Sequence, residues 1–159
     1  MGVRIGLTGD VMLGRLVNRR QRNRSVCAVW GSMLNELRSL DGLLINLECC
    51  LSKRGSPWVR THRPFLFRAD PDWAIPALRE AGVDACALAN NHLMDFGEVA
   101  LQDTISYLTD ADIATAGAGT DRTTAFEPAL IPLGDLCVAV LSFTDNTQAP
   151  IGQLHSNQH

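Results

Sequence analysis

Residues 83–92 read Val83-Asp-Ala-Cys-Ala-Leu-Ala-Asn-Asn-His92, a mostly apolar run that ends in three polar side chains. A short apolar run of this kind is typical of a buried strand. Two other runs have the same form: Val3–Leu7 leads into Thr8-Gly9-Asp10, and Leu43–Leu47 leads into Glu48. Stretches with helical spacing alternate with these runs, which predicts an α/β domain.

The remaining elements follow from apolar spacing and from turn residues. Trp30–Leu37 predicts an amphipathic helix, and Asp72 is expected to cap a helix that ends at Gly82. The segment 15–24 is interpreted as a solvated connection and 53–72 as one irregular loop. The pattern also predicts a helix with Leu101, Ile105 and Leu108 on one face, a strand at Ile113–Ala116, and a hairpin of Leu130–Leu133 and Leu136–Phe143 around Gly134-Asp135.

Composition limits the class of protein. The chain has 159 residues, about one domain, and is 46% hydrophobic and 19% charged, which excludes an intrinsically disordered chain. At the level of bulk charge, the net charge of −3 argues against a polyanion binder, and we expect no nucleic-acid partner. No apolar run reaches the ~20 residues of a membrane span, and the first residues lead directly into a strand. We therefore expect no signal peptide and a cytoplasmic protein.

Polar side chains at three strand ends indicate a candidate site. In open α/β sheets, ligands bind beyond the carboxyl ends of the strands, so Asp10, Glu48, Asn91 and His92 should meet at one edge. Two carboxylates, an amide oxygen and an imidazole form a ligand set that suits Mn, Fe(II) or Zn. The other interpretation is that each residue is a turn former, a helix cap or a surface histidine.

Three short motifs carry a resemblance to a known family. The segments Gly9–Arg15, Asn46–Glu48, and Ala89–His92 with Asp95 and Gly97 resemble the bacterial capsule synthesis family. This family comprises the poly-γ-glutamate synthesis proteins of the CapA type, within the calcineurin-like metallophosphoesterase superfamily. The resemblance implies a four-layer α-β-β-α sandwich with a two-metal site at the strand ends.

The same resemblance implies roles for individual residues. Asp10, Glu48 and Asn91 would be metal ligands, and His92 would be the general acid that protonates a leaving oxygen. Asp95 would orient His92 or would simply be a residue at the entry of a helix. Arg15 would bind a phosphate or a γ-carboxylate of the substrate, or would be an ordinary surface arginine.

Met12 stands where the superfamily has a histidine, a substitution that the pattern of the capsule synthesis family shares. The chain departs from the family pattern in another respect, because family domains continue further and supply more histidine ligands. Residues 1–146 are therefore interpreted as the N-terminal half of a single domain, and 147–159 as a frayed tail. A complete two-metal site is expected only with the missing half, and an uncovered sheet face should remain.

The implied function is metal-dependent hydrolysis or transfer at a phosphate ester or an amide, in capsule biosynthesis. The expected partners are a small-molecule or polymer substrate, such as a phosphate ester or polyglutamate, and capsule synthase subunits. The alternatives are a non-catalytic polymer- or synthase-binding protein and an inactive gene fragment. Cys49 and Cys50, beside Glu48, are either small buried hydrophobic residues or, less readily, a thiol nucleophile.

Overall fold

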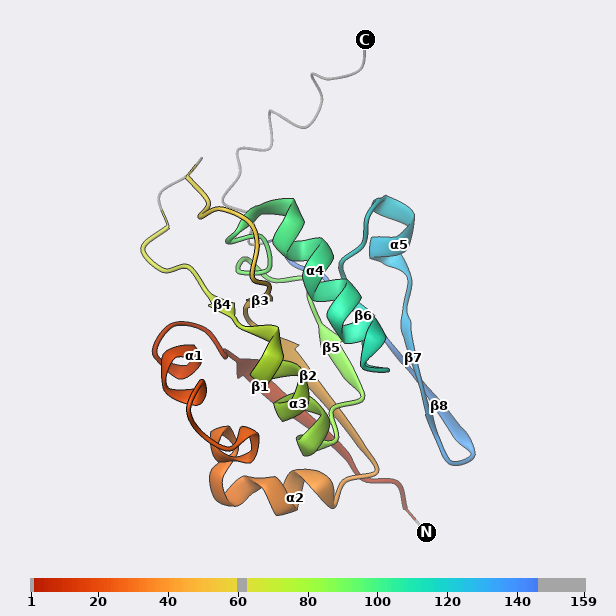
Figure 1. Cartoon of the computed structure of the whole chain (residues 1–159). Helices are drawn as coiled ribbons and strands as arrows, with labels where there is room; N and C mark the ends of the chain where they lie inside the picture. Colours follow the sequence, from red (N-terminus) through yellow and green to blue (C-terminus); the bar gives the residue numbers. More distant parts are fainter. Residues whose placement is uncertain (1, 60–62, 146–159) are drawn as a thin grey trace.

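A parallel sheet with the strand order β1-β2-β5-β6 forms the centre of the computed structural model, which describes residues 2–59 and 63–145 (Figure 1). The predicted α/β class is confirmed. The sheet strands are β1 (Ile5–Val11), β2 (Gly42–Leu47), β5 (Ala85–Ala87) and β6 (Ala114–Ala116). The other elements are α1 (Arg15–Gln21), 3-10 turns η1 (Val26–Val29) and η2 (Gly31–Met33), α2 (Leu34–Arg38), β3 (Cys50–Leu51), β4 (Arg68–Ala69), α3 (Pro71–Ala81), α4 (Gly97–Asp110), α5 (Arg122–Phe126), β7 (Ala129–Leu133) and β8 (Leu136–Val140).

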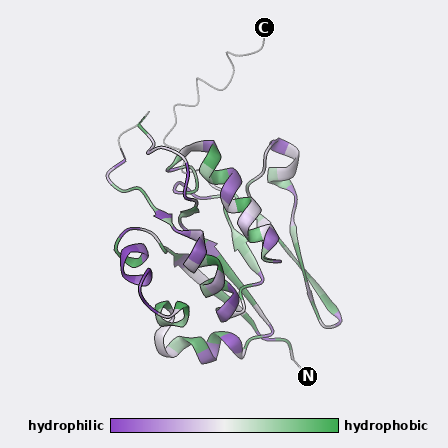
Figure 2. Ribbon diagram, viewed as in Figure 1, coloured by the Kyte–Doolittle hydropathy of each residue, from purple (hydrophilic) through white to green (hydrophobic). Residues whose placement is uncertain are grey.

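The main core lies between one face of the sheet and the helices. Alternate residues of β2 point to this face, where they meet apolar side chains of α3, α4 and the turn after β5. In Figure 2 the central strands and the hairpin are largely green, that is, hydrophobic. The largest fully buried apolar side chains of this core are Leu43, Ile45, Leu47, Leu51, Leu78, Leu88 and Leu108.

The predicted hairpin forms, and it packs on the opposite face of the sheet. Ile131 and Leu133 of β7 are buried against Ala85. The expectation of a wholly uncovered sheet face is therefore wrong, although Leu7 of the edge strand β1 remains 76% exposed. The described residues form three layers, namely helices, parallel sheet and hairpin, and they do not include a fourth layer.

The prediction that segment 15–24 is a solvated connection is wrong, because α1 forms there. Arg15, its first residue, adopts a positive φ of 53°. The preceding residue is Gly14, and a Cβ added to this glycine would lie 2.9 Å from the backbone nitrogen of Arg68. Asn18 anchors the helix, since its Oδ1 accepts hydrogen bonds from the Asp70 backbone N–H (2.9 Å) and Trp73 Nε1 (2.7 Å). This tertiary anchor stabilises a seven-residue helix that would be marginal alone.

Two other details also differ from the sequence analysis. Asp70, rather than Asp72, caps α3, because its carboxylate accepts a hydrogen bond from the Asp72 backbone N–H. The expected loop 53–72 contains β4 and the start of α3, whereas the predicted end of α3 at Gly82 is confirmed by its left-handed conformation. Residues 147–159, interpreted as a frayed tail, lie outside the described residues.

A search of residues 2–59 and 63–145 for helices that could span a bilayer, judged by length and hydropathy, finds none.

Thr104 of α4 provides a test of how the helix is held to β3. Its buried Oγ1 accepts a hydrogen bond from the Leu51 backbone N–H at 2.8 Å and lies 2.6 Å from the Ala100 carbonyl oxygen. We expect Thr104→Val to lower the free energy of unfolding by about 1–3 kcal/mol, because it leaves the Leu51 N–H buried without an acceptor. Thr104→Ser, which keeps the hydroxyl, should cost about 1 kcal/mol. Urea denaturation measures both, and a Val variant more stable than the Ser variant would contradict the assignment.

The exposed apolar side chains of β1 and the hairpin predict self-association. Leu7, Leu130 and Leu136 are each more than half exposed, and surfaces of this kind are usually covered in soluble proteins. We expect concentration-dependent dimers or larger species in sedimentation velocity, and Leu7→Gln should reduce them. Leu16→Gln on α1 is the matched control, since Leu16 is 58% exposed and lies far from this face. A monodisperse monomer of the unmodified chain would show the expectation to be wrong.

Candidate functional site

An irregularity in β1 places Asp10 in the site. β1 and β2 pair in parallel, with Leu7 opposite Leu44 but Asp10 opposite Asn46, so β1 has one extra residue between the two pairs. Without this bulge Gly9 would face Asn46, and Asp10 would point to the other side of the sheet. The strand thus continues to Val11, beyond the end expected at Leu7.

The side-chain amide of Asn46 joins the two predicted acidic ligands. Its Nδ2 donates hydrogen bonds to Asp10 Oδ1 at 2.8 Å and to Glu48 Oε2 at 2.6 Å. The structure therefore brings Asp10 and Glu48 together, as predicted, at the carboxyl end of the sheet. Asn46 was not predicted as a site residue, although a polar side chain within the apolar run Leu43–Leu47 was a usable signal.

Glu48 lies in an unfavourable environment for a carboxylate. Burial raises its pKa above the ordinary value, and the charges of Asp10 and Asp95 raise it further. The hydrogen bond from Asn46 and the nearby His92 act in the opposite direction. A cation at this position would relieve the repulsion between the carboxylates, so the donor chemistry fits a divalent metal.

Asn90 fixes the turn that carries the next two site residues. Its Nδ2 donates to Asn46 Oδ1 (3.1 Å) and to the Leu47 carbonyl oxygen (2.9 Å), while its Oδ1 accepts from the backbone N–H groups of His92 and Leu93. Asn90 was also missed as a site residue. Its side chain is committed to the protein, which leaves its neighbour Asn91 as the candidate ligand.

His92 and Asp95 form a close pair. The Nδ1 of His92 lies 2.6 Å from Asp95 Oδ2, and the imidazole stacks on Phe67 with 3.9 Å between ring centroids. The side chain of His92 is 16% exposed and that of Asp95 is 0% exposed. The Asp95 carboxylate also accepts from the Phe67 backbone N–H (2.7 Å), so Nδ1 carries the proton and Nε2 is the free ring nitrogen.

Arg63 is the second partner of Asp95 and had no recognisable signal in the sequence. Its guanidinium donates to Asp95 Oδ1 (2.6 Å) and to the Asn91 carbonyl oxygen (2.8 Å), and it lies 5.0 Å from the centre of the Trp58 ring. The Nε of Arg63 is buried and has no hydrogen-bond partner among the described residues. Arg63 thus holds both the buried carboxylate and the backbone beside His92.

Asn91 and Arg15 occupy different surroundings. Asn91 lines a cavity of about 110 Å³ with Arg63, Phe65 and His92, and its side chain makes no hydrogen bond to the described residues. Arg15 lies further away, with its guanidinium 4.5 Å from the centre of the Phe65 ring. It lines a second, larger pocket, so the structure does not place Arg15 beside the two carboxylates.

The adjacent cysteines do not form a nucleophilic site. Cys49 and Cys50 are fully buried, and burial raises the pKa of both thiols to about 12. A thiol with this pKa stays protonated near neutral pH and is a poor nucleophile. The interpretation as small buried hydrophobic residues is supported.

The described residues contain no complete cluster of metal-ligating side chains. Among residues 2–59 and 63–145, no group of three or more His, Cys, Asp or Glu side chains is arranged to hold a metal ion. Met12 accepts a hydrogen bond from the Gly14 backbone N–H through its Sδ. Of the predicted ligands Asp10, Glu48 and Asn91, the structure links the first two through Asn46, whereas Asn91 lines the cavity beside His92.

Comparison with known proteins agrees with these motifs. The chain is 39% identical over 107 residues to the probable polyglutamine synthesis accessory protein of Mycobacterium tuberculosis, which covers 66% of this chain and 27% of that protein. It is 26% identical over 139 residues to the capsule biosynthesis protein CapA of Bacillus anthracis, covering 87% of this chain and 34% of the relative. The chain thus spans about a third or less of the length of these relatives. The model for the bacterial capsule synthesis protein PGA_cap matches residues 4–159, and the chain belongs to this family.

Proposed function

We propose that this region carries the acid–base half of a metal-dependent hydrolase or transferase that acts on a phosphate ester or an amide in capsule or polyglutamate synthesis. The observation that carries the proposal is the His92–Asp95 pair, a half-buried imidazole aligned by a fully buried carboxylate. Such a pair typically serves to position a proton donor. The names of the relatives, a polyglutamine synthesis accessory protein and a capsule biosynthesis protein, support the pathway.

The proposal assigns a task to each residue. Asp95 fixes the ring of His92, and Arg63 fixes both Asp95 and the backbone next to His92. In this position, Nε2 can hold a proton for a leaving oxygen or nitrogen. Asp10, Glu48 and Asn91 would hold a Mn, Fe or Zn ion, which supplies a Lewis acid and an activated water when bound. Further ligands for a two-metal site, and the fourth layer of the α-β-β-α sandwich, are proposed to lie in parts of the protein other than the described residues.

A second candidate function is a non-catalytic partner that binds polymer or a synthase subunit. The incomplete metal shell among the described residues favours it. The word "accessory" in the name of the mycobacterial relative points the same way. Turnover assays with added metal separate the two candidates, because a binding partner would turn over neither a phosphodiester nor an activated nitrophenyl ester.

The role of His92 as the acid can be tested by comparing substrates whose leaving groups differ in their need for a proton. In the full-length protein, His92→Ala should lower turnover of a phosphodiester with a poor leaving group by about 10²–10⁴-fold. Turnover of an activated nitrophenyl ester should fall much less, because its leaving group needs no proton. Metal content, measured by elemental analysis, should stay unchanged in this variant. Equal losses on both substrates would make His92 a metal ligand or a structural residue.

The raised pKa of Glu48 gives a separate, activity-free test. A carboxyl group whose folded-state pKa is raised favours folding when protonated and opposes it as the pH rises through that pKa. Glu48→Gln should therefore raise the melting temperature of metal-free protein by a few degrees at pH 7, and by less at pH 4.

Added metal should reverse the order of the two melting temperatures, so that the unmodified protein becomes more stable than Glu48→Gln. Added Mn²⁺ or Zn²⁺ should raise the melting temperature of the unmodified protein and leave Glu48→Gln nearly unchanged, because the variant lacks a ligand. Glu36→Gln, on the surface of α2, is the matched control for loss of one carboxylate. An identical metal response in both variants would remove Glu48 from the site.

A further inference from the structure

A second concave surface, separate from the carboxylates, lies between α1, the segment after β3 and β4. Its cavity has a volume of about 430 Å³, within the range of ligand pockets. We call it the basic pocket, because five of its lining side chains are cationic: Arg15, Arg19, Arg22, Lys53 and Arg68.

Helix α1 and the residue directly after it supply three of these cations from one face. Arg15, Arg19 and Arg22 are spaced by four and three residues, so they lie above one another along the helix. The segment from Val11 to Asn35 contains five arginines and no acidic residue. None of the three guanidinium groups makes an ion pair within the described part of the chain. Their charge is therefore available to a ligand.

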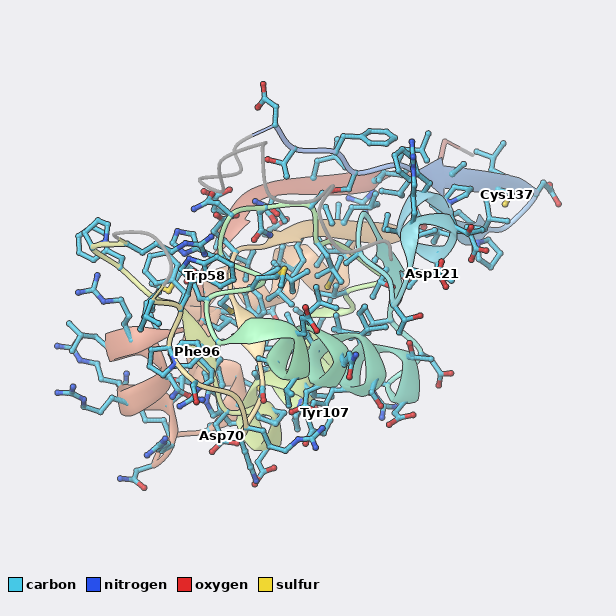
Figure 3. All side chains as sticks on the ribbon, turned by 90° about the horizontal axis from the view of Figure 1, so that it is seen from above. Trp58, Asp70, Phe96, Tyr107, Asp121 and Cys137 are labelled. Atoms are coloured by element: carbon cyan, nitrogen blue, oxygen red, sulfur yellow. The ribbon has the colours of Figure 1, made fainter. Side chains whose placement is uncertain are left out.

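The opposite wall is held in place by contacts of its own. Arg68 donates to the Arg54 carbonyl oxygen (2.9 Å), and its guanidinium lies 4.0 Å from the centre of the Phe96 ring. The acidic lining residue Asp70 is already engaged, since it caps α3 and lies 3.8 Å from Lys53 Nζ. Figure 3 shows Phe96 and Asp70 on the side of the molecule where α1 lies. The pocket is thus a preformed surface with an excess of positive charge.

A row of stacked rings connects the basic pocket with His92. The guanidinium of Arg15 lies over Phe65, Phe65 stacks on Phe67 with centroids 6.4 Å apart, and Phe67 stacks on His92 at 3.9 Å. Arg15 and His92 therefore stand at the two ends of one row of neighbouring side chains. This row gives the direction in which a ligand beside His92 would extend to reach the basic pocket.

We propose that the basic pocket is a subsite for the anionic part of the substrate, and that it takes a ligand with two or more carboxylate or phosphate groups in a row. This inference rests on the proposed function at His92. Guanidinium groups bind either kind of anion through paired hydrogen bonds. Because Arg15 and Arg19 are one helical turn apart, about 6 Å along the axis, a chain with repeated charges can meet several of them, whereas a single anion meets one.

Calorimetric titration of the full-length protein tests the subsite without any turnover. The probes are inorganic tripolyphosphate and a glutamate tripeptide, each compared with a counterpart that has one anionic group, phosphate or acetate. The Arg19→Gln/Arg22→Gln variant should bind the effective probe at least about tenfold more weakly. The matched control is Arg20→Gln/Arg24→Gln, which removes the same charge from the same segment but from residues that do not line the pocket.

The outcomes separate this inference from the proposed function. Binding of tripolyphosphate alone, of the tripeptide alone, or of both supports the subsite and identifies the anion it accepts, provided that only the Arg19/Arg22 variant loses binding. Equal losses in the two double variants would mean that only the overall charge attracts the probes, and would overturn the proposal, as would failure of both probes to bind. If His92-dependent turnover persists in that case, the proposed function stands without the subsite.

Discussion

The buried carboxylate of Asp95 is the interaction on which the arrangement of the site depends. It accepts hydrogen bonds from Arg63 and the backbone of Phe67, which both lie in the segment before β4, and from the ring of His92, three residues before it. Its backbone carbonyl also accepts from Trp58. A fully buried charge is tolerated only with such partners, so these segments can depart from this arrangement only at a large cost in free energy. The position of the imidazole follows from this constraint.

The two carboxylates of the site, Asp10 and Glu48, have fewer stabilising partners than Asp95. Asp10 and Glu48 share one amide donor from Asn46, and the pKa of Glu48 is raised by burial and by its acidic neighbours. Burial of Glu48 thus opposes its ionisation, whereas Asp10 is exposed. A perturbed carboxyl group such as Glu48 is typical of functional sites, and the two carboxylates lie at the sheet edge where α/β proteins bind ligands.

Helix α1 links the fold to the second surface. Asn18 ties it to α3, while the neighbouring arginines stay exposed on the pocket side. The stacked rings of Phe65 and Phe67 then bring this cationic surface to the same side as His92. This family member, which spans about a third or less of its relatives, thus combines the His92–Asp95 pair, two carboxylates and a pocket lined mainly by cationic side chains.

The sequence alone determined the α/β class, the three strand ends that bear Asp10, Glu48 and His92, and the hairpin, because apolar periodicity and turn residues are local signals. It could not reveal α1, whose helix depends on the contact of Asn18 with α3, nor the bulge that turns Asp10 toward Asn46. Arg63 was equally hidden, since it reaches Asp95 across 32 positions of the chain. Tertiary structure alone decided these features, because each is stabilised by partners that are distant in the sequence.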